Sequence, residues 1–363
     1  MPLESFCRPV QPDYEGLLRN LRREGTPDRV YFTELFLDAE VQAQITQRFG
    51  IGDDLDPNDM YHWMKRHIAL QRFLGYDEIM VAVGGWEMPM GDRLVGQDTA
   101  PDAQRRGGGR SWVNEQRGII ASWEDFERYP WPDPAQMNTD LIEWCEAHVP
   151  DDMCLRAGCH HILEFPMWLM GYETMSYALY DDPALVDAVF ERVGQLMVAI
   201  CELLVQFDRI ELIFGGDDMG FRTGTMISPQ ALREKALPWH RRLAEIAHQH
   251  GKLYILHACG NLEEIMPDLI EDVRLDGKHS FEDVIEPVTE AKRKWGDRLA
   301  LLGGMDVDFL ARADEAQIRR RVRETLDVCL PGGGYTLGSG NSVANYIPVD
   351  NYLAMIDEGR RYA

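Results

Sequence analysis

The amino-acid sequence predicts an α/β fold built on a parallel β-sheet. Short, continuous apolar runs alternate with amphipathic helical segments, each run ends in glycine or polar residues, and five such units follow one another in the second half of the chain. Continuous apolar strands are typical of a sheet that is buried on both faces. A (β/α)8 barrel needs about 250 residues, and the chain has 363. We therefore predict one (β/α)8 TIM-barrel domain over residues 1–363.

The second half gives the clearest alternation of strand and helix. Its apolar runs predict strands at residues 209–214, 253–256, 273–277, 299–302 and 335–337. The segments between them predict helices at about 228–250, 262–271, up to 295, and 315–330, with a last helix from about 349. Ser228 followed by Pro229 is typical of a helix start, with serine as the N-cap and proline at the first helical position.

The first half is less regular. We expect an N-terminal arm at about 1–25, strands at 30–35, 79–83 and within 154–165, and a long amphipathic helix at about 183–207. A stretch rich in Gly, Arg and Trp at about 92–135 predicts an inserted hairpin and loop rather than a second domain.

Composition excludes several classes of function. The net charge of −24 disfavours a nucleic-acid partner. No apolar run reaches the roughly 18 residues that a membrane span needs, and residues 1–5 lack the pattern of a signal peptide. The seven cysteines are scattered, which is typical of reduced thiols. These observations predict a cytoplasmic protein with no membrane partner.

His257-Ala258-Cys259, at the end of the apolar run 253–256, is the most informative motif. Residues i and i+2 of an extended segment point to the same face, so the imidazole and the thiol lie side by side. Nitrogen and sulfur donors together are the ligands of zinc, and strand ends are where parallel α/β folds place their sites. The alternative is a buried histidine beside an inert cysteine.

Polar residues after neighbouring strands are further candidates for catalysis. Asp217 and Asp218 follow Gly215-Gly216, and because adjacent residues point in different directions, we expect one of the two to face the site. His279 and Glu282 have a spacing that suits a metal ligand or an acid–base pair. The alternatives are helix capping for the aspartates and a surface position for His279.

Several motifs in fixed order resemble the uroporphyrinogen decarboxylase superfamily. These are Asp217-Asp218-Met219-Gly220, Ser228-Pro229, His257-Ala258-Cys259-Gly260-Asn261, Gly303-Gly304-Met305-Asp306, Pro331-Gly332-Gly333-Gly334-Tyr335 and Gly338-Ser339-Gly340-Asn341. The resemblance covers about residues 25–363. It implies a (β/α)8 barrel, and it allows two activities, because the superfamily holds both decarboxylases and cobalamin-linked, zinc-dependent methyltransferases.

Two departures favour the methyltransferase branch. The true decarboxylases carry an Arg-rich segment after the first strand, whereas residues 34–38 here are acidic and apolar. A polycarboxylate would meet like charge at that segment. The decarboxylases also carry a His after the last strand, where this chain has Asn341.

The methyltransferase resemblance implies that zinc is held by His257 and Cys259 and by a further Cys, whose position is taken by Asn341. A metal shell would therefore need another ligand. The candidates at strand ends are His279, Glu282, Asp217, Asp218, Glu34 and Glu87.

We therefore predict metal-assisted methyl transfer to or from a small thiol, methoxy or amine substrate. Asp217, Asp218, His279, Glu282 and Asn341 are the predicted catalytic residues, and His257 and Cys259 the predicted zinc ligands. A separate corrinoid protein is the expected methyl carrier, because the chain has no room for a cobalamin domain; a homodimer is the state that the resemblance hints at. The alternatives are a metal-free decarboxylase of a small acid, with Arg222 or another cation gripping the carboxylate, and a non-catalytic barrel.

Overall fold

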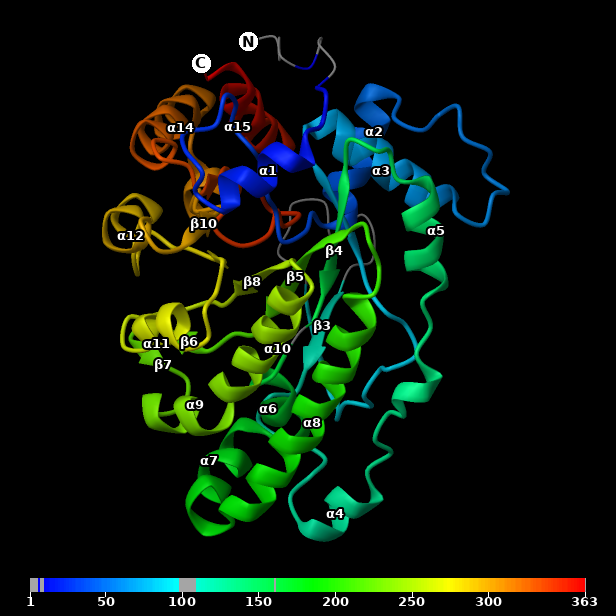
Figure 1. Ribbon diagram of the computed structural model, residues 1–363, viewed down its shortest axis with the longest axis vertical. Coiled ribbons are helices and arrows are strands. Elements are labelled where there is room, and N and C mark those ends of the chain that lie inside the picture. Colours follow the sequence, from blue (N-terminus) through cyan, green and yellow to red (C-terminus); the bar gives the residue numbers. More distant parts are fainter. Residues whose placement is uncertain (1–5, 7–9, 98–108, 160, 363) are drawn as a thin grey trace. The chain divides into compact units, whose positions relative to one another are not determined.

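The structure is a computed structural model that describes residues 6, 10–97, 109–159 and 161–362 (Figure 1). The chain divides into two compact units. Unit 1 comprises Met1–Met80, His148–Arg156 and Asp276–Ala363, and unit 2 comprises Val81–Ala147 and Ala157–Leu275. Strands β1 (Glu78–Val81) and β4 (Cys154–Gly158) begin in unit 1 and end in unit 2.

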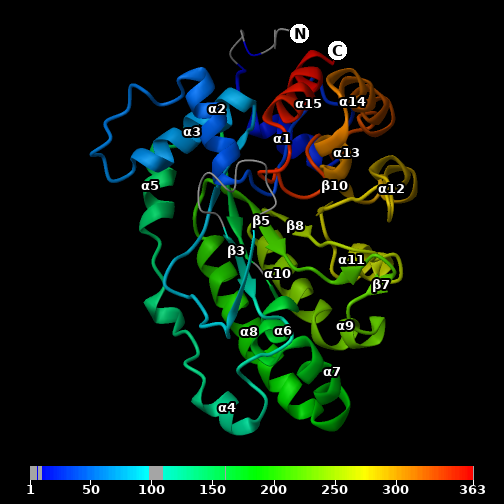
Figure 2. The same ribbon diagram turned by 180° about the vertical axis from the view of Figure 1, so that it is seen from behind.

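Unit 2 is centred on two parallel strands, β5 (Ile210–Gly216) and β8 (Leu253–His257). Their register pairs Leu212 with Leu253 and Gly216 with His257, so both strands end at the same level. Helices α8 (Pro183–Leu204) and α10 (Leu237–Gln249) lie side by side, as Figures 1 and 2 show. The apolar residues of both strands are buried, which confirms the predicted strands at 209–214 and 253–256.

The helix predicted at 228–250 is two helices, α9 (Pro229–Lys235) and α10, joined at Ala236. Pro238 explains the break, because proline has no N–H and its ring clashes with the carbonyl four residues earlier. Ser228 caps α9 as predicted, its hydroxyl accepting a hydrogen bond from the Ala231 N–H. The segment predicted as a helix at 262–271 contains α11 (Met266–Glu271).

Unit 2 also contains two antiparallel pairs. Strands β2 (Arg93–Gln97) and β3 (Gly109–Val113) pair with each other, and so do β6 (Gly220–Phe221) and β7 (Gly224–Thr225). Residues 98–108, between β2 and β3, lie outside the described residues. The other helices that begin in this unit are α4 (Trp123–Arg128), the 3-10 helix η3 (Pro134–Gln136), α5 (Asp140–His148), α6 (Glu164–Met170) and α7 (Tyr172–Asp181).

Unit 1 contains three short parallel strands, β9 (Gly277–His279), β10 (Ala300–Leu302) and β11 (Tyr335–Thr336). Helices α14 (Glu315–Cys329) and α15 (Val349–Arg361) pack together, and both agree with the predicted helices at 315–330 and from 349. The remaining helices of unit 1 are α1 (Tyr14–Leu21), α2 (Ala39–Phe49), α3 (His62–Leu74), α12 (Val288–Trp295) and α13 (Val307–Arg312).

Two predicted strands differ from the structure. Residues 30–35 form no regular strand; Phe32 makes a single parallel bridge to Leu337. The strand predicted at 273–277 begins instead at Gly277, because Arg274 adopts a left-handed φ of 65° that no β-strand accepts. The N–H of Leu275 bonds to the Leu269 carbonyl, so these residues finish the preceding helix.

The structure thus shows an α/β fold with parallel strands in both units, whereas closure into an eight-stranded barrel and a single domain stay predictions. Among the described residues, every helix is too short or too polar to cross a lipid bilayer.

Candidate metal centre

Asp218, His257 and Cys259 come together in unit 2. Their potential ligand atoms all lie within 4.8 Å of one another. Nε2 of His257 is 3.4 Å from Sγ of Cys259 and 3.5 Å from Oδ1 of Asp218. The register of β5 and β8 explains this arrangement. Gly216 pairs with His257, so the residues that follow the two strands leave the sheet at the same end.

The loop after β8 depends on a glycine. Gly260 has a φ of +86°, and a Cβ at this position would lie 2.1 Å from the backbone of Gly220. The N–H of Asn261 donates to the Phe221 carbonyl at 2.8 Å, so the β6–β7 hairpin lies directly against this loop. The close contact of the two backbones fixes the position of Cys259, which immediately precedes Gly260.

The environment of Asp218 favours its ionised form. Burial alone would raise the pKa of this carboxyl, but hydrogen bonds and charge from His257 and Cys259 outweigh burial and lower the pKa to about 2. The backbone N–H of Cys259 donates one of these bonds, at 2.9 Å to Oδ1. About a third of the Asp218 side chain (35%) is exposed, while His257 is 8% exposed, so the group is open to solvent on the aspartate side.

Asp217 has a different environment from that of its neighbour. It is fully buried, and Oδ1 accepts hydrogen bonds from the backbone N–H groups of Leu163 and Glu164 at 2.9 and 3.0 Å. Oδ2 lies 2.8 Å from Nε2 of His240, whose Nδ1 is 2.8 Å from the Tyr254 hydroxyl. The structure therefore places Asp218 beside the His-Cys pair and makes Asp217 a buried junction between β5, α6 and α10.

Glu164 and His161 lie next to this group and were not among the predicted site residues. Oε2 of Glu164 accepts from the Asp218 N–H at 3.1 Å and is 2.7 Å from Nδ1 of His161. Burial raises the pKa of Glu164, although His161 opposes the rise. His161 has a left-handed φ of 71°, a strained backbone of the kind found at functional sites. Nothing in the linear sequence marks such a conformation.

The other three predicted catalytic residues, His279, Glu282 and Asn341, belong to unit 1. His279 ends β9 and is fully buried, and a Cβ on Gly303 would lie 2.9 Å from its Nε2. The carbonyl of Glu282 accepts from the N–H of Ile285 within a turn, and Asn341 is half-buried.

Three residues named as further candidates lie elsewhere. Glu34 is buried, and its carboxyl bonds to the N–H and hydroxyl of Ser339. In unit 2, Glu87 is exposed, and Arg222 is exposed in the turn between β6 and β7.

Comparisons with known proteins identify the family. Residues 115–362 match the family described as uroporphyrinogen decarboxylase (URO-D), and the chain belongs to this family. A curated relative, the methylated-thiol–coenzyme M methyltransferase of Methanosarcina mazei, is 27% identical over 262 residues, which cover 67% of this chain and 68% of the relative. The solved structure of a methyltransferase from Methanosarcina mazei matches with a TM-score of 0.65 and 16% identity over 95% of this chain and 97% of its own. At this identity the structural match supports the fold alone.

Proposed function

We propose that this chain is a methyltransferase that holds a metal ion at Asp218, His257 and Cys259. The observation that supports the proposal is the convergence of one nitrogen, one sulfur and one oxygen donor at the end of two parallel strands. The curated relative is named as a methyltransferase, which favours methyl transfer over the decarboxylation that the family name suggests.

The distances from His257 to the ligand atoms of Cys259 and Asp218 fit a zinc ion. Zinc bonds of about 2.3 Å to sulfur and about 2.0–2.2 Å to nitrogen and oxygen, at tetrahedral angles, separate neighbouring ligand atoms by about 3.3–3.6 Å. Nε2 of His257 lies 3.4 Å from the Cys259 sulfur and 3.5 Å from the Asp218 oxygen, both within this range, and the ligand atoms of all three residues lie within 4.8 Å of one another. A site with three protein ligands leaves one position open, which is typical of catalytic zinc. Asp218 thus supplies the ligand that Asn341 could not.

Each of the three residues has a separate part in the proposed reaction. His257 ends a buried strand, so its imidazole is held rigidly. Asp218 is held by the Cys259 N–H on its side-chain oxygen and by Glu164 on its own N–H. When bound, zinc would act as a Lewis acid that keeps a sulfur ligand in its thiolate form at neutral pH. The exposed side of Asp218 is where we expect the substrate to approach.

The proposed substrate is a small methylated thiol, methoxy compound or amine, and the proposed carrier is a corrinoid on a separate protein. The relative's name supports the thiol among these, because that protein acts on a methylated thiol. A closed (β/α)8 barrel that presents the site at its open end is part of this proposal.

Metal analysis combined with substitution tests the proposal. We expect purified protein to bind about one zinc per chain, and Cys259→Ala and His257→Ala to lose both zinc and methyl transfer from a methylated thiol. Asp181→Asn, which changes an exposed carboxylate at the end of α7, should keep both. Full activity in metal-free protein, or in Cys259→Ala, would overturn the proposal.

A further inference from the structure

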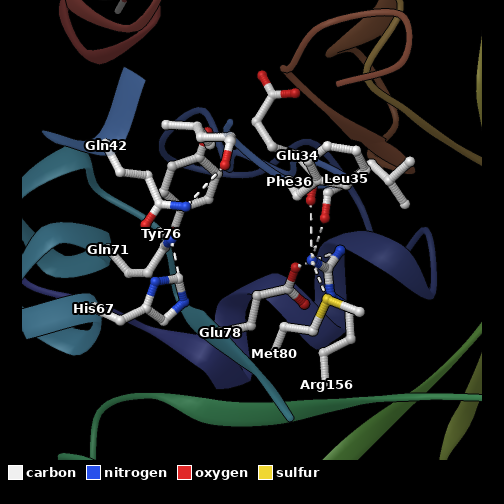
Figure 3. A pocket seen from close by; sticks show the side chains of 11 residues that line it. Glu34, Leu35, Phe36, Gln42, His67, Gln71, Tyr76, Glu78, Met80 and Arg156 are labelled. Atoms are coloured by element: carbon white, nitrogen blue, oxygen red, sulfur yellow. Dashed lines mark hydrogen bonds and ion pairs between the residues drawn. The ribbon is translucent and has the colours of Figure 1, made fainter. Parts of the chain in front are cut away.

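Unit 1 contains a hollow of its own, with a volume of about 70 Å3. On a scale where one water needs about 10–15 Å3, this space holds about five non-hydrogen atoms. Figure 3 shows polar side chains on two opposite sides of it. Gln42 from α2 and His67 and Gln71 from α3 lie on one side, and Glu78 and Met80 from β1 and Arg156 from β4 lie on the other.

Arg156 and Glu78 form a buried pair in the wall of this hollow. Nη1 of Arg156 is 3.2 Å from Oε1 of Glu78, and the two side chains are 7% and 4% exposed. Nη2 of Arg156 donates to the Glu34 carbonyl at 2.9 Å, which holds the guanidinium in place. The pair therefore presents donors and acceptors next to each other while its two charges cancel.

The remaining polar groups of the hollow carry no charge at neutral pH. Burial, together with the charge of Arg156, lowers the pKa of His67, so its imidazole is neutral. Burial raises the pKa of Glu34 to about 8 despite its hydrogen bonds to Ser339, so this carboxyl keeps its proton. Gln42 and Gln71 contribute neutral amides, and the Gln42 amide is fixed by a 2.8 Å bond to the Leu37 carbonyl.

We propose that the hollow between α2, α3, β1 and β4 binds a small uncharged molecule of the carboxamide class. A carboxamide carries an acceptor oxygen and a donor nitrogen on one planar carbon. It therefore matches the guanidinium and carboxylate of Arg156 and Glu78 on one side and the amides of Gln42 and Gln71 on the other. This site belongs to unit 1 and does not depend on the proposed methyl transfer.

Charge distinguishes a carboxamide from a carboxylate or an amidinium ion of the same shape. A carboxylate of the same size would meet the Glu78 carboxylate, and an amidinium would meet the Arg156 guanidinium. Each ion would also leave water for a site that offers no uncompensated opposite charge, which is unfavourable.

Three planar probes of one shape test the proposal: acetamide, acetate and acetamidinium. Each is titrated into the full-length protein at neutral pH, and binding is followed by NMR. A ligand of only four non-hydrogen atoms has little surface with which to offset the cost of binding, so the titrations should extend to millimolar concentrations and beyond. We expect acetamide to bind saturably, with a dissociation constant at least about 10-fold lower than that of acetate or acetamidinium. No saturable binding of acetamide, or tighter binding of either ion, overturns the proposal.

A matched pair of variants locates the binding. Gln71→Met keeps the side-chain length but removes the amide, and should weaken acetamide binding about 10-fold or more. Gln47→Met makes the same change at an exposed position of α2 and should leave binding unchanged. Unfolding curves that match wild type show that both variants are folded. If Gln71→Met bound acetamide as tightly as wild type, the assignment of the site to this hollow would be overturned.

Discussion

The backbone N–H of Cys259 donates a 2.9 Å hydrogen bond to Oδ1 of Asp218, although 41 positions separate the two residues. This bond joins the loops that follow β5 and β8, so two of the three proposed ligands are tied together without any metal. The site is therefore organised in advance, which lowers the cost of ordering the ligands when an ion binds.

Asp218→Asn should weaken zinc binding at least about 10-fold, a loss that even indirect partners of metal ligands commonly produce. The amide keeps the size of the side chain but removes the anionic donor. A competition titration with a coloured chelator measures the affinity, and Asp181→Asn is the control. Equal affinities in wild type and Asp218→Asn would mean that this carboxylate is not a ligand.

Asp217→Ala should destabilise the protein by about 3 kcal/mol or more, because each buried polar group that loses its hydrogen-bond partner costs about 1–3 kcal/mol. It leaves the N–H groups of Leu163 and Glu164 and the ring of His240 without their carboxylate. Denaturant unfolding measures the change. Asp218→Asn, one position along the chain, should cost far less stability, and equal losses in the two variants would contradict the distinction.

Gly260→Ala should reduce both stability and zinc binding. A left-handed φ costs a non-glycine residue about 1–3 kcal/mol, and here the new Cβ would also meet the backbone of Gly220. Gly251→Ala is a matched control, because Gly251 has a φ of +73° but nothing within 4 Å of a Cβ. Only Gly260→Ala should lose zinc binding. If Gly251→Ala lost zinc binding to a similar extent, backbone strain alone would explain the effect, without the contact to Gly220.

Glu34 should make stability depend on pH. Its pKa rises from 4.5 to about 8 on folding, chiefly through burial. Between these values the folded state binds the proton more tightly, so the free energy of unfolding should fall as pH rises, by at most about 1.4 kcal/mol per pH unit. Below both pKa values the carboxyl is protonated in either state and the dependence vanishes.

Glu34→Gln keeps hydrogen-bonding groups for Ser339 but cannot ionise. The variant should therefore gain stability relative to wild type as pH rises from 5 to 8, which urea unfolding at both pH values measures. If the unfolding free energies of the two proteins changed with pH in the same way, Glu34 would not be the source of the pH dependence.

Much of the fold could be predicted because the strands and helices of the second half obey local rules. The runs at 209–214 and 253–256 are apolar and bounded by turns, and α14 and α15 match the predicted helices at 315–330 and from 349. The two errors in the predicted element boundaries come from the backbone conformation of single residues. Pro238 divided a predicted helix, and the left-handed φ of Arg274 moved the start of a strand.

The site could be predicted only in part. The i, i+2 spacing of His257 and Cys259 is visible in the sequence, but the choice between Asp217 and Asp218 depends on the direction in which the chain leaves β5. Glu164, which contacts Asp218, lies 54 positions from it in the sequence, and His240, which contacts Asp217, lies 23 positions from it. Tertiary packing alone brings such residues together, so no local pattern reveals them.

The adjacency of Asp217 and Asp218 has a consequence for comparing relatives. The two residues are chemically identical and neighbours in the chain, yet one is buried against α6 and α10 and the other faces His257. An alignment displaced by a single column at this point would still match one of these aspartates with the other. It would nevertheless transfer a ligand's role to a residue that holds the scaffold together. In this family, assignments at these two columns should rest on superposed strand ends rather than on residue identity.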